Sequence, residues 1–255
     1  MRRYLFLFIV PVLILQACGG GNSNKSEELL NQVSADSTTT SDKPTISEEV
    51  ITDIIQQIPS PLEISVLLKE VGSDYDRSIL NDPGSTSSYN SNYKKALNLG
   101  IYGTDLGYTN IYEQNQDALE YLNSIKTLAD GLSIGQFFNF STIRRLATNS
   151  KNLDSLLLIT TQNFNSINTY LQEQKRSNMS ILLLTGGWLE ALHVSCQVLQ
   201  QQPDNQELRE RIGEQKIILE NIMLLLSFYG SSDPSVNRLT TELKKLEAVF
   251  DRGYH

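Results

Sequence analysis

Hydrophobic side chains recur at intervals of three and four residues along most of the chain after Pro44. This spacing places them on one face of an α-helix, whereas a half-buried strand would alternate apolar and polar residues. Clusters of proline, glycine and short polar residues interrupt the pattern, and such clusters end helices and form turns. The pattern predicts helices over residues 47–58, 61–71, 89–129, 152–174, 178–200, 206–228 and 234–251, with a further short segment over 136–147.

Because no segment alternates convincingly, we expect an all-α fold, a compact bundle of about seven helices joined mostly by short connections. The longest internal connection is residues 73–90, which is polar and contains the turn sequence NDPG. A short TPR-like α-solenoid is the alternative, since Pro203 and Pro234 are 31 residues apart. That architecture needs several copies of a unit of about 34 residues, and the sequence offers one partial match.

The first 44 residues follow a different pattern. Two arginines precede an apolar run over residues 4–15, which is too short for a membrane-spanning helix of about 20 residues. A basic start, a short apolar core and small residues at its end are typical of a secretory signal peptide. The following residues are polar and carry little apolar surface to bury. We therefore expect a signal peptide over 1–17, a disordered tether within 18–44, and one helical domain over 45–255.

The apolar run ends in the sequence LQAC, residues 15–18. This resembles the lipobox of bacterial lipoprotein precursors, and with the helical pattern the chain resembles the all-helical lipoproteins of Bacteroidota. The resemblance implies cleavage before Cys18, a lipid on its thiol, and anchoring in the cell envelope, with the outer membrane expected. Within the tether, Asp36-Ser37-Thr38 resembles the O-glycosylation acceptor of the same bacteria, with a plain solvated linker as the alternative.

The net charge and the cysteine content limit which partners and which covalent cross-links we expect for this protein. The chain carries 21 basic and 29 acidic side chains, and loss of residues 1–17 removes two arginines and no acid. A formal charge of −10 then disfavours nucleic acids, because no basic surface attracts phosphates. With Cys18 lipidated, Cys196 is left without a cysteine partner, so no intramolecular disulfide can form. We expect a membrane contact through the lipid and another envelope protein as partner.

Glycines inside predicted helices form the first candidate site. Each costs about 1 kcal/mol relative to alanine, so several together indicate a steric requirement. The two alternative explanations are close packing of two helices and a groove for an apolar ligand or peptide. The candidate stripe consists of Gly100, Gly103, Gly107, Gly186, Gly187 and Trp188.

Tyrosines form the second candidate site. Tyr102, Tyr108 and Tyr112 lie in one predicted helix and offer rigid apolar area with polar tips. Such a face can bind a peptide or a glycan. The alternative is that these rings are buried, with their hydroxyl groups at the edge of the core.

The spacing of Glu190, His193 and Cys196 places the three side chains along one helix face. A half-buried histidine beside a carboxylate and a small buried cysteine is the structural interpretation. We found no catalytic nucleophile motif, metal-ligand spacing or phosphate-binding loop in the sequence, and we expect no cofactor and no metal.

Three functional hypotheses follow. The first is a non-catalytic interaction or adaptor module, supported if an exposed apolar patch surrounds the glycines. The second is a carrier of a small apolar ligand, glycan or peptide, supported by a closed, dry cavity near Trp188. The third is a hydrolase-like enzyme, which requires carboxylates such as Asp105, Glu113 or Glu190 to converge near His193.

Overall fold

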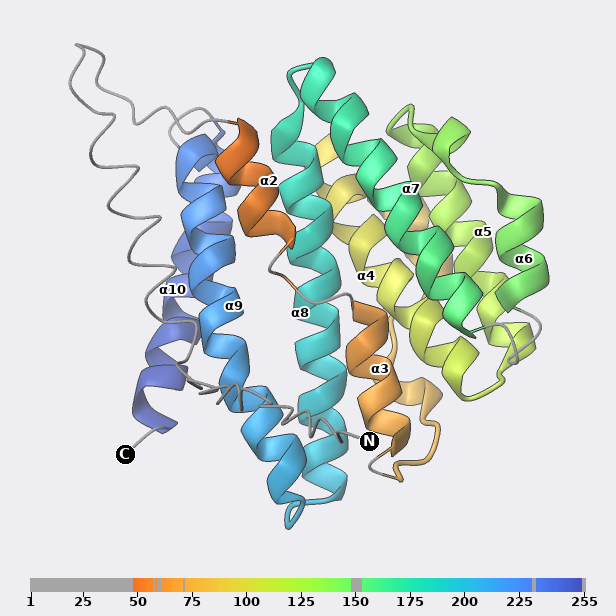
Figure 1. Cartoon of the computed structure of the whole chain (residues 1–255), viewed down its shortest axis with the longest axis vertical. Helices are drawn as coiled ribbons and strands as arrows, with labels where there is room; N and C mark the ends of the chain where they lie inside the picture. The colour runs from red at the N-terminus through yellow and green to blue at the C-terminus, as the bar shows by residue number, and fades with distance from the viewer. Residues whose placement is uncertain are drawn as a thin grey trace, which may run out of the picture. The chain divides into compact units, whose positions relative to one another are not determined.

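The computed structural model describes residues 48–56, 58, 61–70, 72–147, 153–230 and 233–253 (Figure 1). These residues form nine α-helices and three short 3-10 helices, with no strand among them. The expected signal peptide, Cys18 and the tether with Ser37 lie outside the described residues. The elements are α2 (Glu48–Gln56), α3 (Pro61–Glu70), η1 (Arg77–Ile79), η2 (Pro83–Ser88), α4 (Asn92–Ile111), α5 (Asn115–Gly131), η3 (Gly135–Phe137), α6 (Phe140–Ala147), α7 (Leu153–Glu173), α8 (Ser177–Gln201), α9 (Gln206–Gly230) and α10 (Pro234–Gly253). The prediction of an all-α, compact helical fold is confirmed.

Helix α8 lies at the centre of this arrangement and packs against α3, α4, α7 and α9 (Figure 1). Its sequence is apolar on nearly all sides, which is typical of a helix surrounded by other helices. By length and hydropathy α8 could also cross a membrane, but most of its apolar window is buried inside the fold. It is therefore explained as the core helix of the domain.

The remaining helices continue outward from α8 on two sides. On one side α9 packs on α8 and α10 packs on α9. On the other side α4 packs on α8 and α5 packs on α4, with α6 and α7 beside them (Figure 1). The main hydrophobic core runs through these contacts and includes Trp188, Tyr102 and Tyr121. A smaller core cluster is formed by Leu68, Tyr108, Val194, Val198 and Leu208.

Several helices begin at residues whose side chains accept hydrogen bonds from the first turn. The Ser91 hydroxyl accepts from the Lys94 amide at 3.2 Å, and the Asn205 side chain accepts from the Leu208 amide at 3.0 Å. Asp233 precedes Pro234 and accepts from the Ser235 amide at 2.8 Å. These caps satisfy amides that have no partner within the helix. The sequence predicted the starts of α9 and α10 at the observed residues, whereas α4 begins three residues after the predicted start at 89.

The single helix predicted over residues 89–129 is wrong, because the structure breaks it into α4 and α5. The break lies at Tyr112–Gln114, where Glu113 adopts a left-handed backbone with φ of 61°. The Gln114 amide donates to Thr109 O at 2.9 Å, which closes the end of α4. The sequence contains no glycine or proline here, so the usual signal for such a turn is missing.

Candidate functional site

The site begins at the contact between α4 and α8, where two glycines allow the backbones to touch. A Cβ atom on Gly100 would lie 1.9 Å from Leu183 O, and one on Gly186 would lie 1.9 Å from Leu97 O. Neither distance is sterically possible for any residue with a side chain. The Thr104 hydroxyl donates to Gly187 O at 3.0 Å and ties the helices together one turn further on.

The predicted glycine stripe is only partly at this contact. Gly107 and Gly187 are buried with Gly100 and Gly186, but Gly103 is exposed and a Cβ there would meet nothing within 4 Å. The inclusion of Gly103 is therefore wrong, because a spacing of three moves the residue around the helix and away from α8. Trp188 is 2% exposed and faces α9, where its indole nitrogen donates to Gln215 Oε1 at 3.0 Å.

Two carboxyl groups meet beyond the glycine contact. Asp105 of α4 is fully buried, Glu190 of α8 is 6% exposed, and the two side chains interact directly. Asp105 Oδ1 and Glu190 Oε1 find no hydrogen-bond donor among the described residues. The Asn81 amide donates to Asp105 Oδ2 at 3.3 Å. We call Asp105 and Glu190 the carboxyl pair.

Burial in this position changes the acidity of both groups. Burial raises the pKa of Asp105 well above its usual value, and the neighbouring Glu190 raises it further. Burial also raises the pKa of Glu190, while the hydrogen bond from Asn81 and the nearby His193 lower it in part. Neither carboxyl forms an ion pair with a lysine or arginine in the described part of the chain.

The carboxyl pair is covered by residues 73–90, which we call the strap. Its backbone carbonyls accept hydrogen bonds from side chains of three helices. These bonds are Tyr102 Oη to Asp82 O (2.7 Å), Tyr121 Oη to Asn81 O (2.7 Å), Ser124 Oγ to Pro83 O (2.8 Å) and His193 Nε2 to Ile79 O (3.0 Å). The strap is thus bound through its backbone directly above the pair.

The first part of the strap is held by side-chain contacts as well. Tyr75 Oη donates to Asp117 Oδ2 at 2.5 Å, and Arg77 pairs with Asp117 and Glu120 of α5. The Tyr108 hydroxyl accepts from the Asp76 amide at 3.3 Å, and burial raises the pKa of Tyr108 to about 12. These contacts fix the path of the strap from the end of α3 to the start of α4.

The predicted aromatic face is therefore occupied by the chain itself. Tyr102 and Tyr108 are fully buried and Tyr112 is half-buried, with its hydroxyl 2.5 Å from Ser73 Oγ. The peptide that these tyrosines bind is the strap. No sequence pattern indicated this pairing, because a hydroxyl-to-carbonyl hydrogen bond places no requirement on the side chain of the residue that accepts it.

The carboxylates proposed for catalysis are brought together only in part. Asp105 and Glu190 meet, but Glu113 is exposed at the α4–α5 break. His193 is exposed and holds the strap, while Cys196 is half-buried and burial raises the pKa of its thiol. In this conformation the strap shields Asp105 from any substrate.

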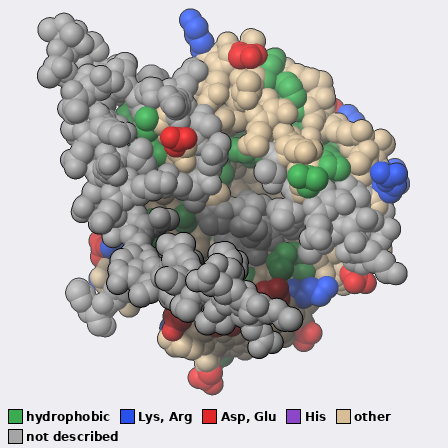
Figure 2. All heavy atoms as spheres, in the orientation of Figure 1, with side chains coloured by type: hydrophobic (Ala, Val, Ile, Leu, Met, Phe, Trp, Pro, Cys, Tyr) green, Lys and Arg blue, Asp and Glu red, His purple; other side chains and the backbone are tan. Residues whose placement is uncertain are grey.

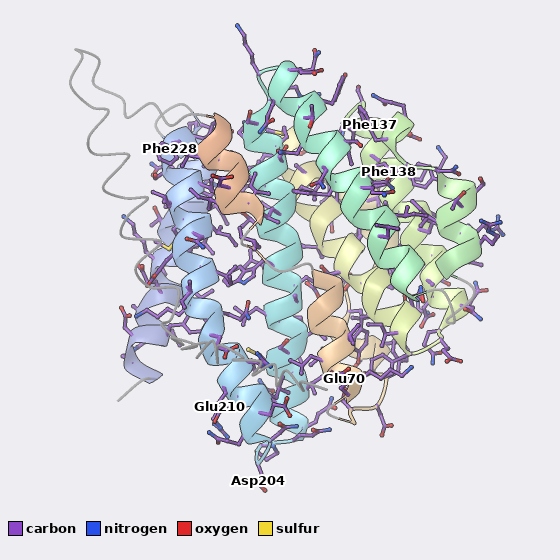
Figure 3. The ribbon with its side chains drawn as sticks, in the orientation of Figure 1. Glu70, Phe137, Phe138, Asp204, Glu210 and Phe228 are labelled. Carbon is purple, nitrogen blue, oxygen red and sulfur yellow. The ribbon has the colours of Figure 1, made fainter. Side chains whose placement is uncertain are left out.

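A separate pocket of about 370 Å³ lies between α3, α8 and α9. Its walls combine aliphatic and polar side chains, namely Val66, Leu67, Leu192, Leu208 and Ile212 with Glu70, Ser195, Arg211, Glu214 and Gln215. Figure 3 shows Glu70 at the end of α3 and Glu210 near the start of α9, at the same end of the helices. Gln215 joins this pocket to the buried Trp188 through its hydrogen bond.

The surroundings give no sign of a metal centre or of a strongly charged surface. Among the residues that the structure describes, no three histidine, cysteine or acidic side chains gather as metal ligands would. On the face shown in Figure 2, acidic and basic side chains are scattered rather than gathered in one patch.

Comparison of the chain with protein-family models, curated proteins and solved structures gives no match.

Proposed function

We propose that this protein is a lipid-anchored binding protein of the cell envelope, whose helical domain takes up a small, mostly apolar molecule. The observation that carries the proposal is the pocket between α3, α8 and α9. Its volume of about 370 Å³ lies at the lower end of the range of small-molecule sites. The anchor is supported by the lipobox-like sequence that ends at Cys18.

The pocket lining indicates what kind of molecule fits. The aliphatic side chains provide an apolar wall, and burial of apolar ligand surface is worth about 25 cal/mol per Å². Two polar groups are already occupied, since Ser195 Oγ donates to Ala191 O and Gln215 bonds Trp188. Arg211 contacts Glu214 through one nitrogen at 3.2 Å, so most of its five donors remain available. Glu70 and Glu214 also line the pocket and can accept hydrogen bonds. The ligand class is therefore an apolar body with one polar end that both donates and accepts hydrogen bonds.

A filled-pocket variant tests this proposal. Ile212→Trp places a large ring in the pocket, and Ile217→Trp places the same ring on α9 at an exposed position that is outside the pocket lining. The probe is 8-anilinonaphthalene-1-sulfonate, which has an apolar body and an acceptor group. We expect Ile212→Trp to weaken probe binding at least about tenfold and Ile217→Trp to leave it unchanged. Equal binding by both variants and the wild type would refute the pocket as the site.

The anchor is tested separately. Cys18→Ser removes the thiol that would carry the lipid, so we expect the protein to leave the membrane fraction and appear in the soluble extract. Retention of the variant in washed membranes would contradict the proposal of a lipid anchor while leaving the pocket unaffected.

An adaptor role toward another envelope protein remains a prediction. Its expected support was an exposed apolar patch around the glycines, and Gly100, Gly107, Gly186 and Gly187 are instead buried between helices. The structure therefore gives the binding-protein hypothesis the more specific basis.

A further inference from the structure

The strap and the carboxyl pair form a structural unit, a loop closed over two buried acids, which has no part in the proposed binding function. The pair consists of two acidic groups buried against each other, with the strap closed above them through Asn81. Two ionised carboxylates are acceptors only, so they repel and cannot hydrogen-bond each other. The arrangement is stable when one of them carries a proton and donates it to the other.

We propose that Asp105 and Glu190 share one proton that keeps the strap closed, and that release of this proton opens the strap as the pH rises. In the closed form one carboxyl donates through its hydrogen to a carboxylate oxygen of the other. On opening, that O–H bond breaks, the proton passes to water, and both groups become carboxylates. The Asn81 amide then faces two full negative charges, and water must enter to solvate them.

The charged groups around the pair leave few other ways to neutralise it. From α8, His193 lowers the pKa of Glu190, but its Nε2 is engaged with the strap at Ile79 O. From the strap, Arg77 is paired with Asp117 and Glu120 of α5. The other facing groups are Tyr102 of α4, Tyr121 of α5 and Asp82 of the strap, none of which supplies a positive charge.

When the pair ionises, the strap opens before the helices separate. Neither η1 nor η2 contains a buried residue, and Ile79 and Leu80 are only half-buried against the core, so hydrogen bonds to the backbone carbonyls are a large part of what holds the strap around the pair. By contrast, α4 and α8 are joined through the glycine contact and the main core. Segments with few buried apolar contacts open locally at lower free energy than packed helices. Opening of the strap brings water to the pair without separating the helices.

Hydrogen exchange of the full chain in detergent, measured by mass spectrometry from pH 5 to 9, tests the proposal. Protection factors, which are corrected for the intrinsic effect of pH, are compared for the strap and for α9–α10. We expect strap protection to fall by up to about tenfold per pH unit, the slope for one released proton, while α9–α10 stay protected. A simultaneous loss in all helices, or no loss anywhere, would overturn the proposal.

Matched variants assign the effect to the pair. Glu190→Gln and Asp105→Asn keep the side-chain shape but cannot ionise, so the strap should stay protected at all these pH values. Glu113→Gln makes the same change at an exposed glutamate and should retain the wild-type pH dependence. A pH dependence that persists in both pair variants would refute the assignment.

A second measurement does not require the variants to fold. The infrared C=O band of a protonated carboxylic acid should be present in the wild type at neutral pH, and it should shift when aspartate and glutamate carry ¹³C. It should disappear over the pH interval in which the strap loses protection. Closure of the strap without any such band would show that no shared proton holds it.

Discussion

The glycine contact between α4 and α8 gives the sharpest test of how this fold is held together. Gly100 and Gly103 lie three residues apart on the same helix, yet a new Cβ has opposite consequences at the two positions. At Gly100 it would lie 1.9 Å from Leu183 O and 2.6 Å from Gly187 N, whereas at Gly103 it would meet nothing within 4 Å. The substitutions Gly100→Ala and Gly103→Ala therefore separate packing from helix propensity.

The size of the change in the free energy of unfolding follows from the distances that a new Cβ atom would have to its neighbours. Real Cβ atoms essentially never approach closer than 3.0 Å to such an atom, so Gly100→Ala must move two backbones apart by about 1.1 Å. Overpacking of this kind costs about 1–3 kcal/mol or more, and the gain in helix propensity of about 1 kcal/mol offsets only part of it. At Gly103 the propensity gain stands alone, so that variant should be more stable than the wild type by about 0.5–1 kcal/mol.

Urea denaturation followed by circular dichroism measures both free energies of unfolding. We expect Gly100→Ala to be destabilised by about 1–2 kcal/mol and Gly103→Ala to be stabilised, with opposite shifts in Tm of about 2–4 °C per kcal/mol. If both alanines stabilise the protein equally, the close contact between α4 and α8 does not exist and the reasoning fails. If both destabilise it, Gly103 has a contact that the structure does not show.

Three further substitutions test the break, the strap and the pair. Glu113→Gly removes the strain of a left-handed non-glycine residue, so the free energy of unfolding should rise by about 1 kcal/mol in urea titrations. Tyr121→Phe removes the donor to Asn81 O, so stability should fall by about 1 kcal/mol and strap amides should exchange faster. Because the folded-state pKa of Asp105 is raised, the folded protein binds a proton more tightly than the unfolded chain, and wild-type stability should fall as the pH rises above about 4. Asp105→Asn should lack this fall, so it should exceed the wild type in stability at pH 8 but not at pH 4.

Local patterns in the sequence predicted most of the helices. The helices expected over 152–174, 178–200, 206–228 and 234–251 are found as α7 to α10 with ends shifted by at most two residues. Their periodicity, caps and turn residues all lie within a few positions of one another, so no tertiary knowledge is needed to read them. The break at Glu113 was missed because it depends on a backbone conformation that glutamate rarely adopts.

The sequence could identify individual residues of the candidate site, but it could not show which of them meet in the folded protein. Asp105 and Glu190 stand out as acids within apolar helices, but they are 85 residues apart and only the contact of α4 with α8 brings them together. The polar strap resembles any solvated loop in sequence, because three of the hydrogen bonds that hold it over the pair end on its backbone carbonyls. The aliphatic pocket lining comes from three helices, and each of those residues has an ordinary helical spacing on its own.

The glycine contact and the carboxyl pair are physically linked. Asp105 lies five residues beyond Gly100, and Glu190 lies four residues beyond Gly186, so both carboxyls follow closely on the contact. Helices separated by ordinary side chains lie about 8–10 Å apart, which leaves room for water beside buried polar groups. The direct backbone contact removes that room, and this exclusion of water is what raises the pKa of both acids.

It follows that Gly100→Ala should change the titration of the pair as well as the stability of the fold. Separation of the helices admits water, which favours the ionised carboxylates and lowers the raised pKa of Asp105. The decline of stability above pH 4 should then be shallower or end at lower pH in Gly100→Ala than in the wild type, while Gly103→Ala should keep the wild-type decline. Urea titrations of the three proteins from pH 4 to 9 measure this difference. Identical pH dependence in Gly100→Ala and the wild type would show that the pair is shielded by the strap alone.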